Sequence, residues 1–333
     1  MATFPNGLNL TRPDFGGVDQ NVDIHMEEHI GIVDSTFAYT SHLAKELAGS
    51  THQTNSTNQL RFERLSSAKV MGRQAGEDLV AQQTKQSPAY IVVDRLSYVR
   101  HVFDLQDIWT QNRDYRTSIA KNHGTLLAQA FDKNAMIAAM KAPEFVPPPE
   151  VADAIKPGSL VTTTLDGTER TSAAAATIIA AHSQLVEQMT RDGKSDALFT
   201  EGVTYVSPRV FAILRESDKL MNVQYSQGSG NNYAQGRVAL LNGIRVEELG
   251  VMPDTAITDN PLGPAFNITA AEAQRQMVLF IPSLSHIVAQ VRGLEAGIWD
   301  DKTRMATYLQ TDHLYNIGLR RPDCVGVVSF KTA

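Results

Sequence analysis

The chain has 333 residues, which is enough to bury a sizeable core and gives a prior of about two domains. Its formal net charge is −6, with 30 Lys and Arg against 36 Asp and Glu, and this balance argues against a protein held on nucleic acid by net charge. The single cysteine excludes an internal disulfide, and residues 1–7 lack the charged and apolar regions of a signal peptide. No apolar run is long enough to span a bilayer, so we expect no membrane partner.

The N-terminal part of the chain predicts an arm rather than a core. Residues 1–20 are rich in Gly, Pro and Asn and indicate irregular structure. Residues 21–48 carry apolar side chains at spacings of three and four, which predicts one or two helical pieces with an apolar stripe. A polar break over 49–58 follows.

The next stretch predicts a long two-stranded ribbon. Residues 59–65 alternate, with Leu60 and Phe62 on one face and charged side chains on the other, as in a strand with one wet side. Residues 66–88 are small or polar, and residues 90–103 form a long β-type run. Because an isolated ribbon is marginally stable in water, it must find partners in its own core or on another chain.

The remainder mixes helices and strands without strict alternation, so we predict an α+β fold. A long helix is expected within 104–142, with its helical stripe over 116–141, and a second over 172–190 with Gly193 at its end. Ser207 and Pro208 indicate a helix start, and residues 224–236 a flexible loop. The expected strands are 203–206, 244–249, 277–281 and 308–319.

The end of the chain predicts a core strand. Pro322 is followed by an apolar, β-branched run over 324–330, which is typical of a strand buried on both faces. Such a strand must pair with strands formed by earlier residues, so we expect the body of the protein to close on itself.

One motif could hold a metal. The spacing of His25, Glu28 and His29 matches an inverted zincin pattern, in which two histidines bind zinc and the glutamate acts as the base. We favour the alternative, a solvated polar face on an arm helix, because nothing before the motif could wall off a cleft and no third ligand is evident.

Other motifs are weaker still. Gly193-Lys194-Ser195 imitates the end of a P-loop, but the first glycine is missing and the preceding segment is helical, so we interpret it as a helix end. Residues 228–230 lack the third glycine of a dinucleotide fingerprint. Cys324 lies in an apolar strand and is expected to be a buried structural thiol. We therefore predict no catalytic residue and no cofactor.

Charged side chains occupy both the strands and the tip of the predicted ribbon. All of them could belong to a solvated hairpin. A long ribbon, however, exposes edges that invite docking, and mixed charges suit an interface in which register matters more than affinity. The candidate assembly residues are Arg61, Glu63, Arg64, Lys69, Arg73, Glu77, Asp78 and Lys85.

The order of these pieces resembles the HK97 fold of tailed-bacteriophage major capsid proteins, and among them looks closest to those of T7-like podoviruses. Three segments carry the resemblance: Met71-Gly-Arg-Gln-Ala-Gly-Glu-Asp-Leu79 at the tip of the presumed E-loop, residues 203–214, and the tail over 318–330. Each segment alone is moderately specific, and the resemblance extends over nearly the whole chain.

The resemblance implies a division of the chain. Residues 1–50 would be the N-terminal arm, 51–103 the E-loop ribbon, and 104–200 the P-domain with its spine helix. Residues 201–300 would be mainly the A-domain, and 301–333 the strands that return to the body.

The resemblance also implies a structural protein that is not an enzyme. Hexamers and pentamers would form an icosahedral phage head, T=7 in the family, around double-stranded DNA. Scaffolding and portal proteins would assist assembly in the host cytoplasm, and decoration or minor capsid proteins could join the virion. The Lys–Asn crosslink of the HK97 phage itself is not carried over, since Lys69 and Lys85 lie in the E-loop without an assignable Asn and Glu. The alternatives are an encapsulin-type compartment of the same fold and a zinc-dependent hydrolase using His25, Glu28 and His29.

Overall fold

The computed structural model describes residues 20–54, 57–76, 78–79, 81–104, 116–217 and 240–331. These residues belong to two compact units. Unit 1 comprises the described residues within 20–40, 98–127 and 294–313, and unit 2 comprises those within 41–97, 128–293 and 314–331. The expected loop over 224–236 and nearly all of the expected irregular arm lie outside the described residues.

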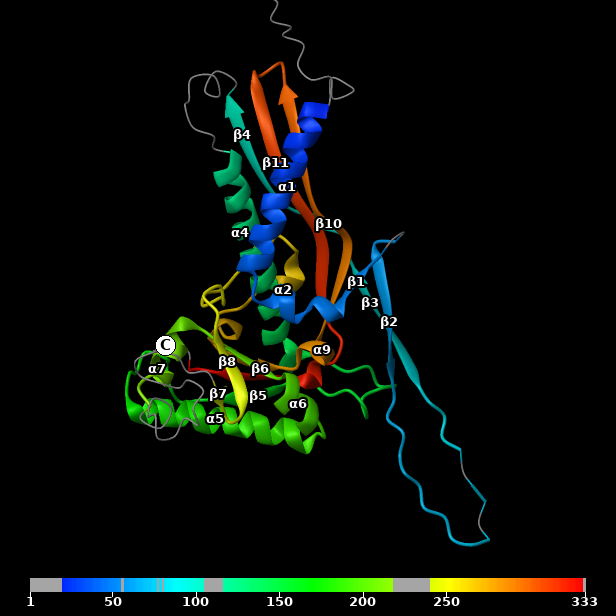
Figure 1. Ribbon diagram of the computed structural model, residues 1–333. Helices are drawn as coiled ribbons and strands as arrows, with labels where there is room; N and C mark the ends of the chain where they lie inside the picture. Colours follow the sequence, from blue (N-terminus) through cyan, green and yellow to red (C-terminus); the bar gives the residue numbers. More distant parts are fainter. Residues whose placement is uncertain are drawn as a thin grey trace, which may run out of the picture. The chain divides into compact units, whose positions relative to one another are not determined.

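The described elements are helices and strands in mixed order (Figure 1). The helices are α1 (Gln20–Thr40), α2 (Leu43–Glu46), α4 (Arg116–Met140), α5 (Ser172–Arg191), α6 (Ser195–Glu201), α7 (Pro208–Leu214) and α9 (Pro282–Ser285). The strands are β1 (Thr51–Gln53), β2 (Gln59–Leu65), β3 (Gln86–Val92), β4 (Ser97–Asp104), β5 (Ser159–Thr162), β6 (Val203–Val206), β7 (Leu240–Leu241), β8 (Ile244–Glu248), β9 (Met277–Phe280), β10 (His286–Asp301), β11 (Ala306–Leu319) and β12 (Val325–Ser329).

Three sheets organise these strands. The six-stranded sheet has the order β5-β12-β9-β6-β8-β7, the four-stranded sheet has the order β1-β10-β11-β4, and β2 and β3 form a two-stranded sheet. Parallel and antiparallel pairs occur in the same sheet, since β12 is parallel to β5 and antiparallel to β9. The α+β class predicted from the sequence is therefore confirmed.

The C-terminal strand β12 lies inside the six-stranded sheet of unit 2, as the sequence predicted. Helix α5 crosses it so closely that a Cβ on Gly326 would lie 3.2 Å from Leu185 and 3.5 Å from the Met189 sulfur. The α5 helix is capped by the Thr171 hydroxyl, which accepts from the Ala174 N–H at 3.2 Å. The strand thus packs tightly into the core of unit 2.

The structure confirms several predicted elements and corrects two. Helix α4 matches the expected 116–141 helix, and β2 matches the expected 59–65 strand. The single long strand expected over 90–103 is wrong, because β3 ends at Val92 and β4 belongs to a different sheet. The sequence also failed to predict β10, the longest strand described.

In unit 1, helices α1 and α4 are in close contact. A Cβ on Gly124 would lie 2.7 Å from the Val33 carbonyl oxygen and 2.8 Å from the Thr36 Cβ, so only glycine allows this approach. Both helices pack on β11, because His29 of α1 and His123 of α4 bind the same Thr311 hydroxyl. A network of hydrogen-bonded polar side chains therefore occupies the interior of this unit.

This hydrogen-bond network links α1, β4, α4 and β11 within unit 1. The His29 Nε2 lies 3.1 Å from the Thr311 Oγ1, the His123 Nδ1 lies 2.9 Å from it, and the His123 Nε2 lies 2.7 Å from the His101 Nδ1. Three neutral rings satisfy all these bonds if His29 donates to Thr311, Thr311 to His123, and His123 to His101. Burial and the two neighbouring rings lower the pKa of His123 to about 4, and burial also lowers the pKa of His29.

This arrangement predicts acid sensitivity within unit 1. The folded pKa of His123 lies below its usual 6.5, so the unfolded chain binds the proton more tightly and stability is lost as pH falls from about 6.5 to about 4. We expect local opening of residues 20–40 and 116–127 to increase over this range, by at most about tenfold per pH unit for each such proton. Hydrogen exchange at several pH values measures this opening, and His123→Gln should flatten its pH dependence.

The matched control is His182→Gln in unit 2. His182 is also buried with a pKa lowered to about 4, and it contacts the Thr204 hydroxyl at 3.0 Å. Its replacement should leave the pH dependence of exchange in unit 1 unchanged. An unchanged pH dependence in His123→Gln would contradict the prediction.

Candidate assembly surface

The β2–β3 ribbon is a regular antiparallel pair at its base. The register runs from Gln59 opposite Val92 to Leu65 opposite Gln86. One further exchange follows, in which the Ser66 N–H donates to the Lys85 carbonyl at 2.9 Å and the Lys85 N–H donates to the Ser66 hydroxyl at 3.0 Å. Beyond this point the two limbs continue as an extended loop without strand pairing (Figure 1).

The two faces of the ribbon base differ, as the alternating sequence predicted. Leu60 and Phe62 pack against a small apolar cluster that contains Ile91 of β3 and Ile287 and Ala289 of β10. On the opposite face, Arg61 and Glu63 form an exposed ion pair at 3.0 Å. Such a pair adds little stability on its own. The base is therefore held by apolar packing within unit 2.

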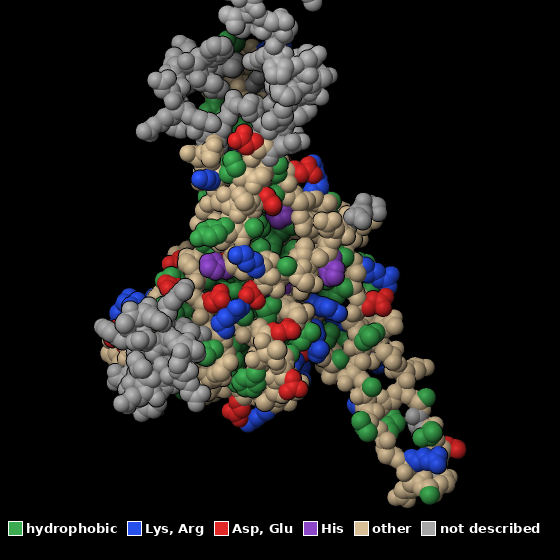
Figure 2. All heavy atoms as spheres, in the orientation of Figure 1, with side chains coloured by type: hydrophobic (Ala, Val, Ile, Leu, Met, Phe, Trp, Pro, Cys, Tyr) green, Lys and Arg blue, Asp and Glu red, His purple; other side chains and the backbone are tan. Residues whose placement is uncertain are grey.

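The loop between Ser66 and Lys85 is almost entirely open to solvent. Every described side chain from 67 to 85 is exposed. One described bond crosses the loop, from the Lys69 N–H to the Gln82 Oε1 at 2.9 Å. Figure 2 shows hydrophobic, basic and acidic side chains interspersed along it. The described residues of the loop therefore form no apolar core.

Three apolar side chains of this loop have no cover in the single chain. Val70 is 103 % exposed, Leu79 is 81 % exposed and Met71 is 53 % exposed. The candidate assembly residues expected from the sequence are all charged and do not include these three. The sequence does distinguish them, because they are large apolar residues in a segment that is otherwise small and polar. Val70 and Met71 are adjacent in the sequence, so this part of the loop is a candidate for contact with another surface.

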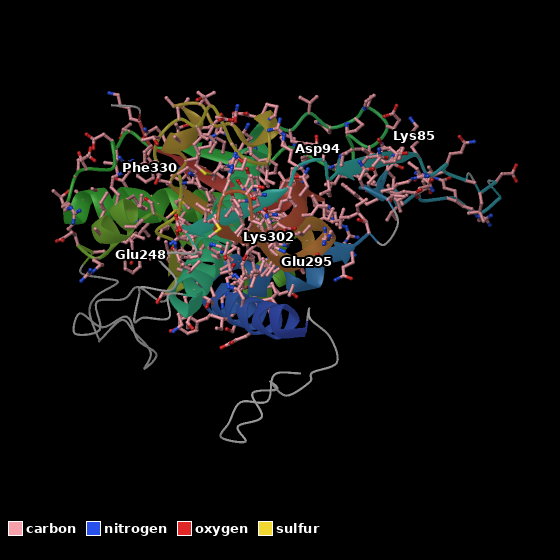
Figure 3. The ribbon with its side chains drawn as sticks, turned by 90° about the horizontal axis from the view of Figure 1, so that it is seen from above. Lys85, Asp94, Glu248, Glu295, Lys302 and Phe330 are labelled. Atoms are coloured by element: carbon pink, nitrogen blue, oxygen red, sulfur yellow. The ribbon has the colours of Figure 1, made fainter. Side chains whose placement is uncertain are left out.

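The candidate charged residues do not form one surface. Lys69, Arg73, Asp78 and Lys85 are exposed on the loop, and Figure 3 labels Lys85 on the ribbon. Arg61 and Glu63 face outward on β2. Glu77 lies outside the described residues. Arg64 is set apart from the others, because it shares the face of Leu60 and Phe62 and is half-buried.

The motif at His25, Glu28 and His29 does not gather into a metal site in the described structure. Within the described residues, no group of three His, Cys, Asp or Glu side chains could hold a metal ion. Glu28 is exposed and His29 is buried against Thr311, while the side chain of His25 is outside the description. The expected solvated face is wrong for His29, because its ring fills the interior of unit 1.

The other motifs have structural roles. Gly193 adopts a φ of 77° at the end of α5, and Lys194 is buried against Asp323 with a nitrogen-to-oxygen distance of 2.6 Å. The P-loop-like residues therefore form a helix end, as interpreted from the sequence, and Lys194 adds a buried ion pair that the sequence did not predict. Cys324 is buried, and burial raises the pKa of its thiol to about 11, so it is a poor nucleophile.

None of the helices in the described residues is both long and apolar enough to cross a membrane.

Comparison with known proteins gives no match by sequence family but a clear match by structure. No family model and no curated protein matches the chain. The subunit of the mature capsid of bacteriophage PhiM1 is 30 % identical, with 100 % of both chains covered and a TM-score of 0.76. The capsid structure of the cyanophage P-SCSP1u is 17 % identical, covering 85 % of this chain and 86 % of that one, with a TM-score of 0.70.

A third structure shows how widely the fold is distributed. The virus-like particle from Pyrococcus furiosus is 10 % identical, covers 92 % of this chain and 99 % of that one, and has a TM-score of 0.51. At such low identity the likeness concerns the fold alone. The match to the PhiM1 capsid subunit is stronger, because it combines 30 % identity with full coverage of both chains. The chain therefore belongs to the bacteriophage major capsid proteins of the HK97 fold.

Proposed function

We propose that this chain is the repeating subunit of an icosahedral phage head, built from hexamers and pentamers and enclosing double-stranded DNA. The observation that carries the proposal is the full-length likeness to the subunit of the mature PhiM1 capsid. The function is assembly of a shell, with no chemical step and no cofactor. The subunit would reside in the virion, after assembly in the host cytoplasm.

We also propose the finer assignments that the resemblance implies. Residues 1–50 would be the N-terminal arm, 51–103 the E-loop, 104–200 the P-domain with α4 as spine, 201–300 mainly the A-domain, and 301–333 the returning strands. The phage would be of the T7-like podovirus type with a T=7 head. Scaffolding and portal proteins would take part in assembly, and decoration or minor capsid proteins could bind the finished shell.

The loop between Ser66 and Lys85 would supply contact between neighbouring subunits. Full burial of a side chain such as Val or Leu stabilises by about 1.5–3 kcal/mol, before the cost of ordering the loop is subtracted. Each contact is therefore modest. Because it repeats around the shell, many such contacts together give a durable particle. The exposed charges of Lys69, Arg73 and Asp78 would then set register.

The acidic balance of the chain is compatible with this role. A formal charge of −6 does not favour tight binding to DNA phosphates. A shell that surrounds DNA has no need to bind it tightly, provided that packaging is driven by another machine. Contacts between subunits, rather than contacts with DNA, would hold the particle together.

Electron microscopy tests the proposal directly. The full chain, expressed with the scaffolding protein of its phage, should form closed shells or capsomers. A chain that remains a stable monomer under all assembly conditions would overturn the proposal. Shells that capture a cargo enzyme through a peptide groove would instead indicate a compartment of the encapsulin type.

Deletion of the loop tests its part in assembly. We expect that replacing 67–84 by a two-residue turn leaves unit 2 folded, because the β2–β3 pairing and its apolar cluster lie outside the deletion. The variant should form no shells. Circular dichroism and microscopy measure the two results. A deletion variant that cannot fold would place the loop within the subunit core.

A matched pair of valines tests the apolar contact. Val70 of the loop and Val146, outside it, are 103 % and 83 % exposed, and both belong to unit 2. Val70→Ser should raise the protein concentration needed for assembly by about tenfold or more, since it removes apolar area buried in the shell. Val146→Ser should change it little. Equal effects of the two substitutions would argue against a contact made by the loop.

A further inference from the structure

One short stretch of strand β11 contacts both limbs of the ribbon base. The Asn316 side-chain amide donates to the Val92 carbonyl of β3 at 2.6 Å. The Arg64 guanidinium of β2 donates to the Leu319 carbonyl at 2.9 Å. These contacts join residues more than two hundred positions apart in the sequence. The residues of this stretch, 316–319, are called the seat.

Gly318 of the seat allows a close approach of the ribbon base, because it has no side chain. A Cβ at this position would lie 2.6 Å from the Ile91 Cδ1 and 3.0 Å from its Cγ1. The Ile91 side chain therefore lies directly over the backbone of β11, and the ribbon base cannot come so close to a strand with a larger residue there. The seat combines two hydrogen bonds with one close apolar contact.

Arg64 differs from an ordinary surface arginine. Its guanidinium carbon lies 5.2 Å from the centre of the Phe62 ring and 4.8 Å from that of Phe145. In the described structure, no carboxylate forms an ion pair with it, and its Nε–H has no hydrogen-bond partner. A planar guanidinium held by one carbonyl and two aromatic rings has its orientation fixed by shape rather than by a counter-charge.

Open space borders this arginine. A cleft of about 700 Å³ is lined by Arg64 and Leu65 from the ribbon and by residues such as Ile155, Lys156, Asp192 and Arg320 from the rest of unit 2. Within the described residues, this open space leaves one side of the end of β2 without packed side chains. At this end of β2, beyond the apolar cluster of the base, Arg64 contacts the Leu319 carbonyl and the Phe145 ring.

We propose that Arg64 is the positioning residue of the ribbon, which, together with the seat at 316–319, fixes the direction in which the paired base leaves unit 2. Freedom of movement is then confined to the loop between Ser66 and Lys85. The importance of this direction for shell formation rests on the proposed function. The positioning itself is a property of the single subunit.

Distances between paired spin labels test the positioning in the unassembled full chain. One label pair, at Gln86→Cys and Glu187→Cys, reports on the ribbon base relative to α5, and a second, at Ala75→Cys and Glu187→Cys, reports on the loop. All three positions are exposed, whereas Cys324 is buried with a thiol pKa raised to about 11 and should stay unlabelled. We expect a narrow distance distribution for the base and a broad one for the loop.

Substitutions then distinguish the effect of Arg64 from that of Arg61 on the same strand. Arg64→Ala should broaden the distribution of the base pair, and Arg64→Lys should also broaden it, because lysine keeps the charge without the planar stacking surface. Arg64→Met keeps the packing of the stem and serves if Arg64→Ala does not fold. Arg61→Ala is the matched control, since Arg61 lies on the exposed face of the same strand, and it should leave the distribution narrow.

The outcomes distinguish the positioning from the proposed function. A base distribution that stays narrow in Arg64→Ala and Arg64→Met would overturn the positioning role, whatever happens to shells. Restoration by Arg64→Lys would overturn the part assigned to stacking. A broadened base in the Arg64 variants, together with loss of their shells while the unsubstituted chain forms shells, supports both proposals. Absence of shells from the unsubstituted chain would count against the proposed function alone.

Discussion

Strand β12 is the constraint around which unit 2 is built. It is hydrogen-bonded on one side to β5 and on the other to β9, and four of its five residues are buried. Backbone groups in such a position need partners on both sides, so the sheet stays incomplete until these C-terminal residues are in place. In the Lys194–Asp323 ion pair, Asp323 lies in the turn directly before this strand, and α5 contacts Gly326 within it. The core of the subunit therefore closes within a single chain.

The ribbon follows the opposite principle. Its regular pairing ends after Ser66 and Lys85, and the described residues of the loop beyond form neither an apolar core nor paired strands. Val70, Met71 and Leu79 remain exposed there, which is unfavourable for an isolated molecule. A subunit that is complete in its core but incomplete on its surface suits repeated association. In the proposed shell, burial of these side chains between subunits would favour assembly.

Several helices and strands could be predicted from the sequence, because the spacing of apolar residues reflects local structure. Helix α4 and strand β2 follow from their spacing of apolar residues. The break between β3 and β4 could not be predicted, because residues 93–96 contain no glycine or proline and the strands separate only through their sheet partners. Strand β10 was missed because Gly293 and Gly297 weaken its strand signal. Arg64 was grouped with surface charges, although the alternation of β2 places it with Leu60 and Phe62.

The placement of charge explains why the core and the ribbon behave differently. Asp323 is buried between Lys194 at 2.6 Å and Arg321 at 3.1 Å, and breaking such a network leaves a buried charge without compensation. Arg64 is half-buried and is held by one carbonyl and two rings, and among the described residues no carboxylate forms an ion pair with it. The ion pairs of Asp323 hold the core in one arrangement. The contacts of Arg64 orient the ribbon base, and they can change without breaking a buried ion pair. In the proposed shell, one ribbon must contact neighbours in both hexamers and pentamers. Contacts of the kind that Arg64 makes would keep the ribbon base in place while the loop between Ser66 and Lys85 adapts to each neighbour.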